Sequence, residues 1–338
     1  MDDGLIKKIE KLYGLKIYSQ QQNRDVYQLE TNQGNLCFKE IEYSLKKFLF
    51  IYNAMEHLLK NGFNQLPAFI HTLTGDPYIT YQDKYYFLSE WLDGRESDFD
   101  NLADLEMGLI ALAKLHRASK GFKPPSNVKV KSRLGVWPKR FKKRLKALKE
   151  FRDIALNREE QTRFDRYYLK HADTIIEEGE KSLKILESSA YDKLNKQAKK
   201  DRTFCHNDFV YHNVLIDDSI PKAYIIDYDY CRYDIRVYDL ARLIRRLIKE
   251  KKYKEDILDI VLTAYNSEYP LLKEEYPILA AFLQFPQRCW RMCDRYYNNK
   301  RDWGEKKFRS RLKRAVRRYR YKRSLVKEII SYEKKQTY

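Results

Sequence analysis

One stretch of the chain, from residue 203 to residue 229, predicts short β-strands inside a region otherwise patterned for helices. Its polar residues stand at the ends of apolar runs, where His206, Asp208, Asn213 and Asp227 are found. Loops held on a rigid scaffold commonly carry binding and catalytic residues. The stretch therefore predicts a fold in which a small β-insert presents a loop site within a helical part.

The spacing H-x-D-x-x-x-x-N, followed by a strand that ends in Asp, suits phosphoryl transfer. This reaction needs a carboxylate to orient the acceptor hydroxyl and hard oxygen ligands to hold Mg²⁺ on the phosphates of ATP. We expect Asp208 to be the catalytic base, Asn213 and Asp227 to bind Mg²⁺, and Asp229 to add a carboxylate. Each piece alone is common in ordinary turns, so the interpretation depends on the ordered set.

This ordered set resembles the aminoglycoside phosphotransferase and choline kinase superfamily. The resemblance implies an α+β, protein-kinase-like two-lobed fold, with a β-rich N-lobe and a mainly helical C-lobe that contains a small β-insert. On matching positions it implies a base at Asp208, Mg²⁺ ligands at Asn213 and Asp227, and a loop-stabilising His206. Asp239, in the motif Asp239-Leu240-Ala241, is expected to brace the catalytic loop.

The N-lobe is predicted to span residues 1–93. Residues 14–41 are patterned for strands with a turn at Asn32–Asn35, and residues 44–60 show helical spacing. Further strands are predicted at 68–73, 78–81 and 85–91, followed by a hinge at 92–95.

The C-lobe is predicted to span residues 94–338 and to be helical outside the 203–229 insert. It would supply the helices that bind the acceptor. Helical periodicity predicts segments from residue 101, from Pro138, and at 160–186, 190–200, 238–250, 254–267, 272–296 and 305–333.

Lys39, on the second strand of the predicted hairpin, stands where such kinases place the lysine that binds the ATP phosphates. A solvated surface lysine is the alternative, since the chain has 67 basic residues. We expect Glu56 to pair with Lys39, with Glu42 as the second choice. Glu90 and Trp91, just before the hinge, are expected to contact the nucleotide.

Two segments depart from the kinase pattern. The turn at 18–25, which would cover the triphosphate, contains no glycine, so backbone amides approach phosphates less closely. Only residues 230–237 follow Asp229 before the next helix, which is short for docking a peptide substrate.

A second resemblance spans nearly the whole chain. Residues 61–63, 72–75, 86–96 and 112–122, with Phe285-Pro286, Trp290 and Trp303, are similar to the CotS family of spore-coat proteins. This resemblance implies a place in the spore coat. The acidic start, Met1-Asp2-Asp3-Gly4, is not typical of a signal peptide, so synthesis in the cytoplasm is expected. Trp290 and the pair Tyr296-Tyr297 are candidates for lining an acceptor pocket, and His116 is a candidate ligand. For all of them, packing in the core is the alternative.

The net charge of +19 favours anionic partners, among them acidic coat proteins, over polycationic substrates. The basic helix face at 139–146 and the segment 309–323 are expected to attract polyanions without sequence specificity, because no DNA-reading motif is present. No apolar run is long enough to span a membrane. The five cysteines form no CxxC pair, so neither a disulfide framework nor a zinc site is predicted.

Three functions remain open from the sequence. The chain is an ATP-dependent kinase of the spore coat, acting on a small molecule, a polymer or a coat protein. Alternatively, it is a weak or inactive kinase-fold scaffold in coat assembly, or a metabolic small-molecule kinase similar to choline or homoserine kinases. The set Lys39, Asp208, Asn213 and Asp227 favours activity, and the glycine-free turn favours the scaffold.

Overall fold

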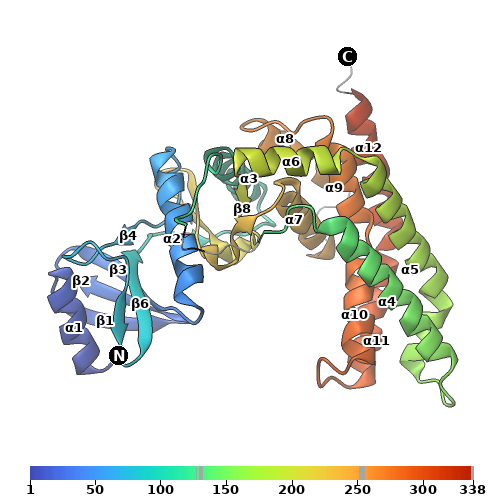
Figure 1. Cartoon of the computed structure of the whole chain (residues 1–338), viewed down its shortest axis with the longest axis horizontal. Helices are drawn as coiled ribbons and strands as arrows, with labels where there is room; N and C mark the ends of the chain where they lie inside the picture. The colour runs from blue at the N-terminus through green and yellow to red at the C-terminus, as the bar shows by residue number, and fades with distance from the viewer. Residues whose placement is uncertain (127, 129–131, 251–255, 336–338) are drawn as a thin grey trace. The chain divides into compact units, whose positions relative to one another are not determined.

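The computed structural model describes residues 1–126, 128, 132–250 and 256–335, which belong to two compact units (Figure 1). Unit 1 combines residues 1–132, 201–233 and 263–269. Unit 2 combines residues 133–200, 234–262 and 270–338. The predicted boundary between residues 93 and 94 falls inside unit 1 and stays a prediction.

Unit 1 begins with an antiparallel sheet in the order β1-β2-β3-β6-β4, with β5 also paired to β6 (Figure 1). The predicted hairpin is confirmed, since β2 and β3 pair from Val26 opposite Lys39 to Thr31 opposite Gly34. The strands are β1 Ile17–Asn23, β2 Val26–Thr31, β3 Gly34–Glu40, β4 Phe69–Ile70, β5 Ile79–Tyr81 and β6 Lys84–Glu90.

Helix α1 (Asp3–Tyr13), which the sequence analysis did not predict, covers one face of this sheet. The Asp2 side chain accepts a hydrogen bond from the Leu5 amide at 2.8 Å and caps the helix. Leu5 and Ile9 are buried with Phe38 of β3. Phe38 therefore points towards α1.

Helix α2 (Leu45–Lys60) lies on the other face, where Phe48 packs against Phe69 and Phe87. Neighbouring side chains on a strand point to opposite faces. Lys39 follows Phe38 and thus points to the α2 side of the sheet, away from the α1 core.

The 203–229 segment forms the predicted β-insert of unit 1. Strands β9 and β10 pair antiparallel, β9 also pairs with β7, and β8 pairs with β11. Helix α3 (Leu102–Ala118) packs against β10. The remaining elements are β7 Arg95–Glu96, β8 Phe204–Cys205, the 3-10 turn η1 Tyr211–Asn213, β9 Val214–Asp217, β10 Lys222–Ile225, the 3-10 turn η2 Tyr228–Tyr230 and β11 Arg232–Tyr233.

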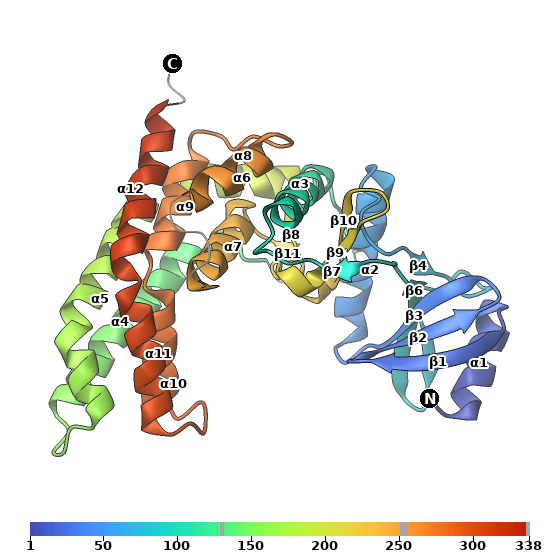
Figure 2. The same cartoon turned by 180° about the vertical axis from the view of Figure 1, so that it is seen from behind.

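Unit 2 is helical, and both α5 and α12 lie against α9 (Figure 2). Phe151, Tyr168, Cys293 and Leu312 belong to its buried core. Its helices are α4 Trp137–Leu156, α5 Arg163–Ser188, α6 Tyr191–Asp201, α7 Val237–Glu250, α8 Ile257–Asn266, α9 Glu275–Gln284, α10 Gln287–Tyr297, α11 Glu305–Arg317 and α12 Tyr319–Lys335. The last residue of α6 and the C-terminal part of α8 are assigned to unit 1.

Two predictions of single long helices are wrong. The segment 272–296 is divided at Phe285–Pro286 into α9 and α10, because Pro286 has no N–H to continue the α9 ladder. The segment 305–333 is divided at Arg318 into α11 and α12. Part of the predicted helix at 254–267 falls outside the described residues. Within the described ranges, none of the helices is both long enough and apolar enough to cross a membrane.

Candidate functional site

The loop after β8 is held by hydrogen bonds to the buried ring of His206. The Asp208 amide donates to His206 Nδ1 at 3.2 Å, so Nδ1 is the acceptor and Nε2 carries the hydrogen. Nε2 then donates to the Ile226 carbonyl oxygen at 3.1 Å. The ring therefore ties the loop to the strand end that precedes Asp227.

Asn213 closes the same loop from the other side. Its Nδ2 donates to the Asp208 carbonyl oxygen at 3.0 Å, and its own carbonyl oxygen accepts from the Ile226 amide at 3.0 Å. These bonds fix the side-chain amide and orient Oδ1, an oxygen of the kind that Mg²⁺ prefers. The Asp208 carboxylate is half-buried on this braced loop.

Asp227 has a left-handed backbone, with φ 61° and ψ 72°, a conformation that is rare outside glycine. Its Oδ1 is buried and accepts no hydrogen bond from any residue that the structure describes. The nearest cation is Lys39, whose Nζ lies 3.7 Å from this oxygen. A buried carboxylate oxygen without a donor is costly, and a metal cation is one kind of group that would satisfy it.

Lys39 makes its closest contact with Asp229, at 3.1 Å from Nζ to Oδ2. Tyr43 donates its hydroxyl hydrogen to the other oxygen of Asp229 at 2.7 Å. Burial acts to lower the pKa of Lys39, but Asp229 and Asp227 outweigh it, so that the pKa lies above its ordinary value. The lysine is thus held as a cation between two carboxylates.

Tyr43 is a site residue that the sequence analysis missed. Burial and the neighbouring carboxylate of Asp229 raise the pKa of its hydroxyl well above the ordinary value, so it stays a hydrogen-bond donor. Lys47, one turn later, places its Nζ 3.8 Å from the centre of the Tyr43 ring. A tyrosine before a helix carries no sequence signal for such a role, because its partner is 186 residues away.

The expected partner of Lys39 differs from the observed one. Among the described residues, Lys39 forms ion pairs with Asp229 and Asp227, and none with Glu56 or Glu42. Glu56 is half-buried on α2, and Glu42 is exposed. Asp229, which takes the place of the expected glutamate, is also held by the Tyr43 hydroxyl.

The other residues expected near the nucleotide lie at the end of β6. The Glu90 carboxylate accepts a hydrogen bond from the Ala68 amide at 3.0 Å. This bond holds the end of β6, just before the predicted hinge at 92–95. The Trp91 amide donates to the Asn35 carbonyl oxygen at 3.2 Å. Their contact with a nucleotide stays a prediction.

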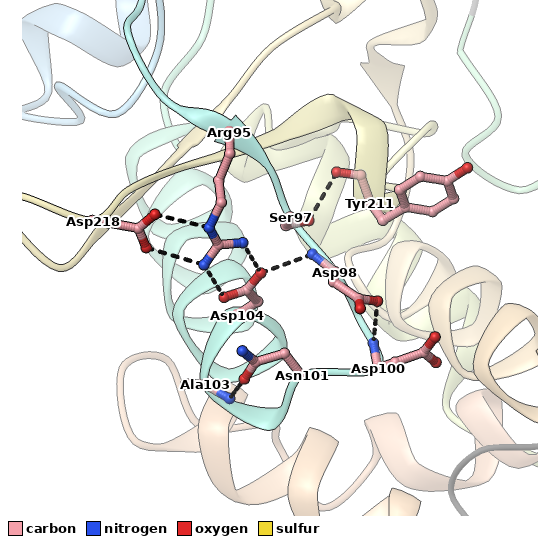
Figure 3. A network of polar contacts seen from close by, with 9 residues as sticks. All are labelled: Arg95, Ser97, Asp98, Asp100, Asn101, Ala103, Asp104, Tyr211 and Asp218. Atoms are coloured by element: carbon pink, nitrogen blue, oxygen red, sulfur yellow. Dashed lines mark hydrogen bonds and ion pairs between the residues drawn. The ribbon is translucent and has the colours of Figure 1, made fainter.

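An ion-paired network joins β7, α3 and the loop that carries Asp208 and Asn213 (Figure 3). Arg95 donates to both oxygens of the buried Asp104, at 2.6 and 2.9 Å, and to both oxygens of Asp218, at 2.8 and 3.0 Å. Ser97 donates its hydroxyl hydrogen to the Tyr211 carbonyl oxygen at 2.8 Å, next to Asn213. The network therefore fixes the β9–β10 turn and the loop relative to β7.

The turn between β1 and β2 is the glycine-free segment noted in the sequence. Arg24 has a positive φ of 54° and forms an ion pair of 2.7 Å with Glu96 of β7. This exposed ion pair links the β1–β2 turn to β7. Asp239, the remaining predicted residue, is fully buried in the first turn of α7 in unit 2, and its bracing role stays a prediction.

The fold is that of the protein-kinase-like phosphotransferases. The crystal structure of an aminoglycoside phosphotransferase from Alicyclobacillus acidocaldarius is similar, with a TM-score of 0.85 at 18% identity over 99% of this chain and 97% of that one. An amicoumacin kinase in complex with AMP-PNP and Ca²⁺ has a TM-score of 0.59 at 13% identity, over 94% and 93% of the two chains.

Residues 6–329 match the family described as "Spore coat putative kinase YutH", and the chain belongs to this family. Spore coat protein S of Bacillus subtilis (strain 168) is 27% identical over 301 residues, which cover 88% of this chain and 84% of that protein. The two resemblances stated from the sequence, to kinase-like phosphotransferases and to spore-coat proteins, are confirmed.

Proposed function

We propose that this chain transfers a phosphoryl group from Mg-ATP to a hydroxyl-bearing acceptor of the spore coat. The observation that carries the proposal is the meeting of Lys39, Asp227 and Asp229 beside the loop of Asp208 and Asn213. The acceptor is a small molecule, a polymer or a coat protein. The place in the coat follows from the family and from Spore coat protein S.

In this proposal the Asp208 carboxylate orients the acceptor hydroxyl and takes its proton. The Lys39 ammonium group exchanges Asp229 for an oxygen of the donor phosphates, to which it is bound as a point charge. Asp227 and the Oδ1 of Asn213 would hold the metal, and the buried Oδ1 of Asp227, which accepts no hydrogen bond from a described residue, fits this role. A bound Mg²⁺ neutralises charge on the transferred phosphate. Positioning and charge stabilisation supply most of the rate.

The first prediction separates nucleotide binding from catalysis. Mg-ATP should raise the melting temperature of the wild-type protein, because a ligand that binds the native state stabilises it. Asp227→Asn keeps the size of the side chain but removes its charge, and should abolish the Mg²⁺-dependent part of the shift. Asp208→Ala should keep that shift and lose roughly 10²-fold or more in turnover with spore-coat extract as acceptor.

A wild-type protein without any shift at millimolar Mg-ATP would contradict nucleotide binding. Full activity of Asp208→Ala would contradict the assignment of the base. An exposed-site variant, Asp192→Asn on α6, controls for loss of one carboxylate.

A second candidate function is a nucleotide-binding scaffold without turnover. The glycine-free β1–β2 turn favours it, because Arg24 and the flanking long side chains keep backbone amides away from phosphates. This candidate predicts the Mg-ATP shift together with no turnover in any extract fraction.

A further inference from the structure

A pocket in unit 2 is lined by four cationic side chains. They come from the second half of α7, the α9–α10 junction, and the region where α11 passes into α12. None of the described lining residues carries a carboxylate. The lining consists of Arg245, Ile248, Phe285, Pro286, Gln287, Arg288, Cys289, Ala315, Arg318, Tyr319 and Lys322.

Two of these cations, Lys322 and Arg245, donate hydrogen bonds to backbone carbonyl groups. Lys322 Nζ donates to the carbonyl oxygens of Gln284 and Phe285, both at 2.8 Å, and Arg245 Nε donates to that of Ala241 at 3.0 Å. In the described part of the chain, Arg245, Arg288 and Lys322 form no ion pair within 4.0 Å.

A carboxylate close to Lys322 is already used. Glu178 is buried and accepts from Arg323 at 2.6 Å, and it also accepts from the Gln284 amide group. Its charge is therefore compensated outside the pocket lining. The lining residues themselves supply cations and no compensating carboxylate.

The cations destabilise one another in this position. Burial and the neighbouring Arg245 lower the pKa of Lys322 to about 7, although Cys289 and Glu178 oppose this change. Burial, Arg242 and Arg291 lower the pKa of Arg245 to about 10, although Tyr238 acts in the opposite sense. Cations whose pKa values are lowered by burial and by one another mark a candidate binding site for a group of opposite charge.

The backbone adds to this attraction. Gln287, Arg288 and Cys289 form the first turn of α10, which has 11 residues, and all three line the pocket. The Gln287 amide already donates to the Phe285 carbonyl oxygen at 2.8 Å, and the helix dipole places a partial positive charge at this end. A helix N-terminus together with guanidinium groups is a frequent arrangement at phosphate sites.

We propose that the pocket formed by Arg245, Arg288, Arg318 and Lys322 binds a phosphate-bearing ligand. Phosphate suits it better than a single carboxylate, since a phosphate monoester carries about −1.5 to −2 charges at neutral pH and offers three acceptor oxygens. Guanidinium forks match this geometry in two parallel hydrogen bonds. The site lies within unit 2, does not include Lys39 or Asp227, and does not depend on phosphotransfer.

The test is calorimetric titration of the full chain with inorganic pyrophosphate, in EDTA and at fixed ionic strength. We expect saturable binding by the wild type. The double variant Arg245→Gln/Arg288→Gln should bind roughly tenfold more weakly or worse, as expected for lost charge-assisted hydrogen bonds. Lys143→Gln/Lys306→Gln removes the same charge from exposed positions outside the pocket and should retain wild-type affinity.

Two further measurements decide the interpretation. Without pyrophosphate, the pocket variant should melt no lower than the wild type, because like-charge repulsion is relieved. Asp227→Asn should retain pyrophosphate binding, since it alters only the site in unit 1. Equal losses in the pocket and control variants would show general attraction to a basic surface and overturn the proposal. Loss of binding in Asp227→Asn, or no saturable binding by the wild type, would overturn it as well.

Discussion

At Gly94 the backbone leaves no room for a side chain. Its φ is 155°, and a Cβ added there would lie 2.8 Å from the Ile216 carbonyl oxygen. We expect Gly94→Ala to lower the free energy of unfolding by roughly 1–3 kcal/mol. The causes are backbone strain at the positive φ and the forced separation of residue 94 from β9. Urea unfolding measures this loss.

Gly304→Ala is the matched control, because a Cβ at Gly304 meets nothing within 4 Å and its φ is not in the left-handed region. Gly304 is also the N-cap of α11, where alanine is less favourable than glycine, so the change in stability should stay below about 1 kcal/mol. Equal effects at the two glycines would contradict the close approach at Ile216.

Asp234, just before α7, predicts a pH dependence of stability. The side chain is fully buried and accepts a hydrogen bond from Trp137 Nε1 at 3.0 Å. Burial raises the pKa of Asp234 from 3.8 to about 7, although the hydrogen bonds from Trp137 and from the Ile235 amide oppose this. Between these values the native state keeps a proton that the unfolded chain has lost, so the free energy of unfolding falls as pH rises.

Asp234→Asn should remove this contribution. Relative to the variant, the wild type should lose on the order of 2–4 kcal/mol between pH 4 and pH 8, measured by denaturant unfolding at several pH values. Asp192→Asn, at an exposed position of α6, should follow the wild type throughout. A constant difference between wild type and Asp234→Asn would show that Asp234 is ionised over the whole range.

Between elements, Arg95 and Arg24 allow a buried ion pair to be compared with an exposed one. Arg95 holds the buried Asp104 and joins β7 to α3, whereas Arg24 makes an exposed pair with Glu96. Arg95→Ala leaves a buried carboxylate without its cation and should lower the melting temperature by several degrees. Arg24→Ala should change it little, because exposed ion pairs contribute little. Similar effects would contradict the bracing role of the network.

Local patterns in the sequence predicted most of the elements, and the strands of unit 1 in particular. The hairpin around the turn Asn32–Asn35 is a short-range signal and is confirmed, although the turn is shorter than predicted, since Gly34 and Asn35 already pair with β2. Helix α1 went unpredicted because only 11 residues carry its pattern before the strands begin. The break at Pro286 was readable from its missing N–H, but the apolar pattern continues across it.

The candidate site was predictable as a set of residues and less so as a set of contacts. Spacing placed Asp208, Asn213 and Asp227 on one insert, because these positions are close in sequence. The ion pair of Lys39 with Asp229 joins positions that are 190 residues apart in the sequence. It depends on the path of the chain between β3 and α2, where Tyr43 lies. No local sequence pattern predicts that the Tyr43 hydroxyl donates a hydrogen bond to Asp229, the residue that pairs with Lys39 in place of Glu56.

For the whole molecule, the net charge of +19 predicts attraction to polyanions. Binding to heparin should weaken steeply between 50 and 200 mM salt, since counterion release dominates such contacts. The measurement is the elution position on a heparin column at several salt concentrations, with a neutral protein of similar mass as the control. Elution together with that control would remove the prediction. The pyrophosphate pocket is tested separately, because its titration holds ionic strength fixed.

Unit 1 is assembled from three separate stretches of chain, and this has a consequence for synthesis on the ribosome. The sheet and α3 emerge early, but the segment 201–233 follows only after the 133–200 stretch of unit 2. Until then the surface that later receives β9 and β10 is unpaired and open to wrong partners. Unit 1 should therefore be sensitive to protease in a nascent chain that has emerged only to about residue 200, and protected in one that has emerged beyond residue 270.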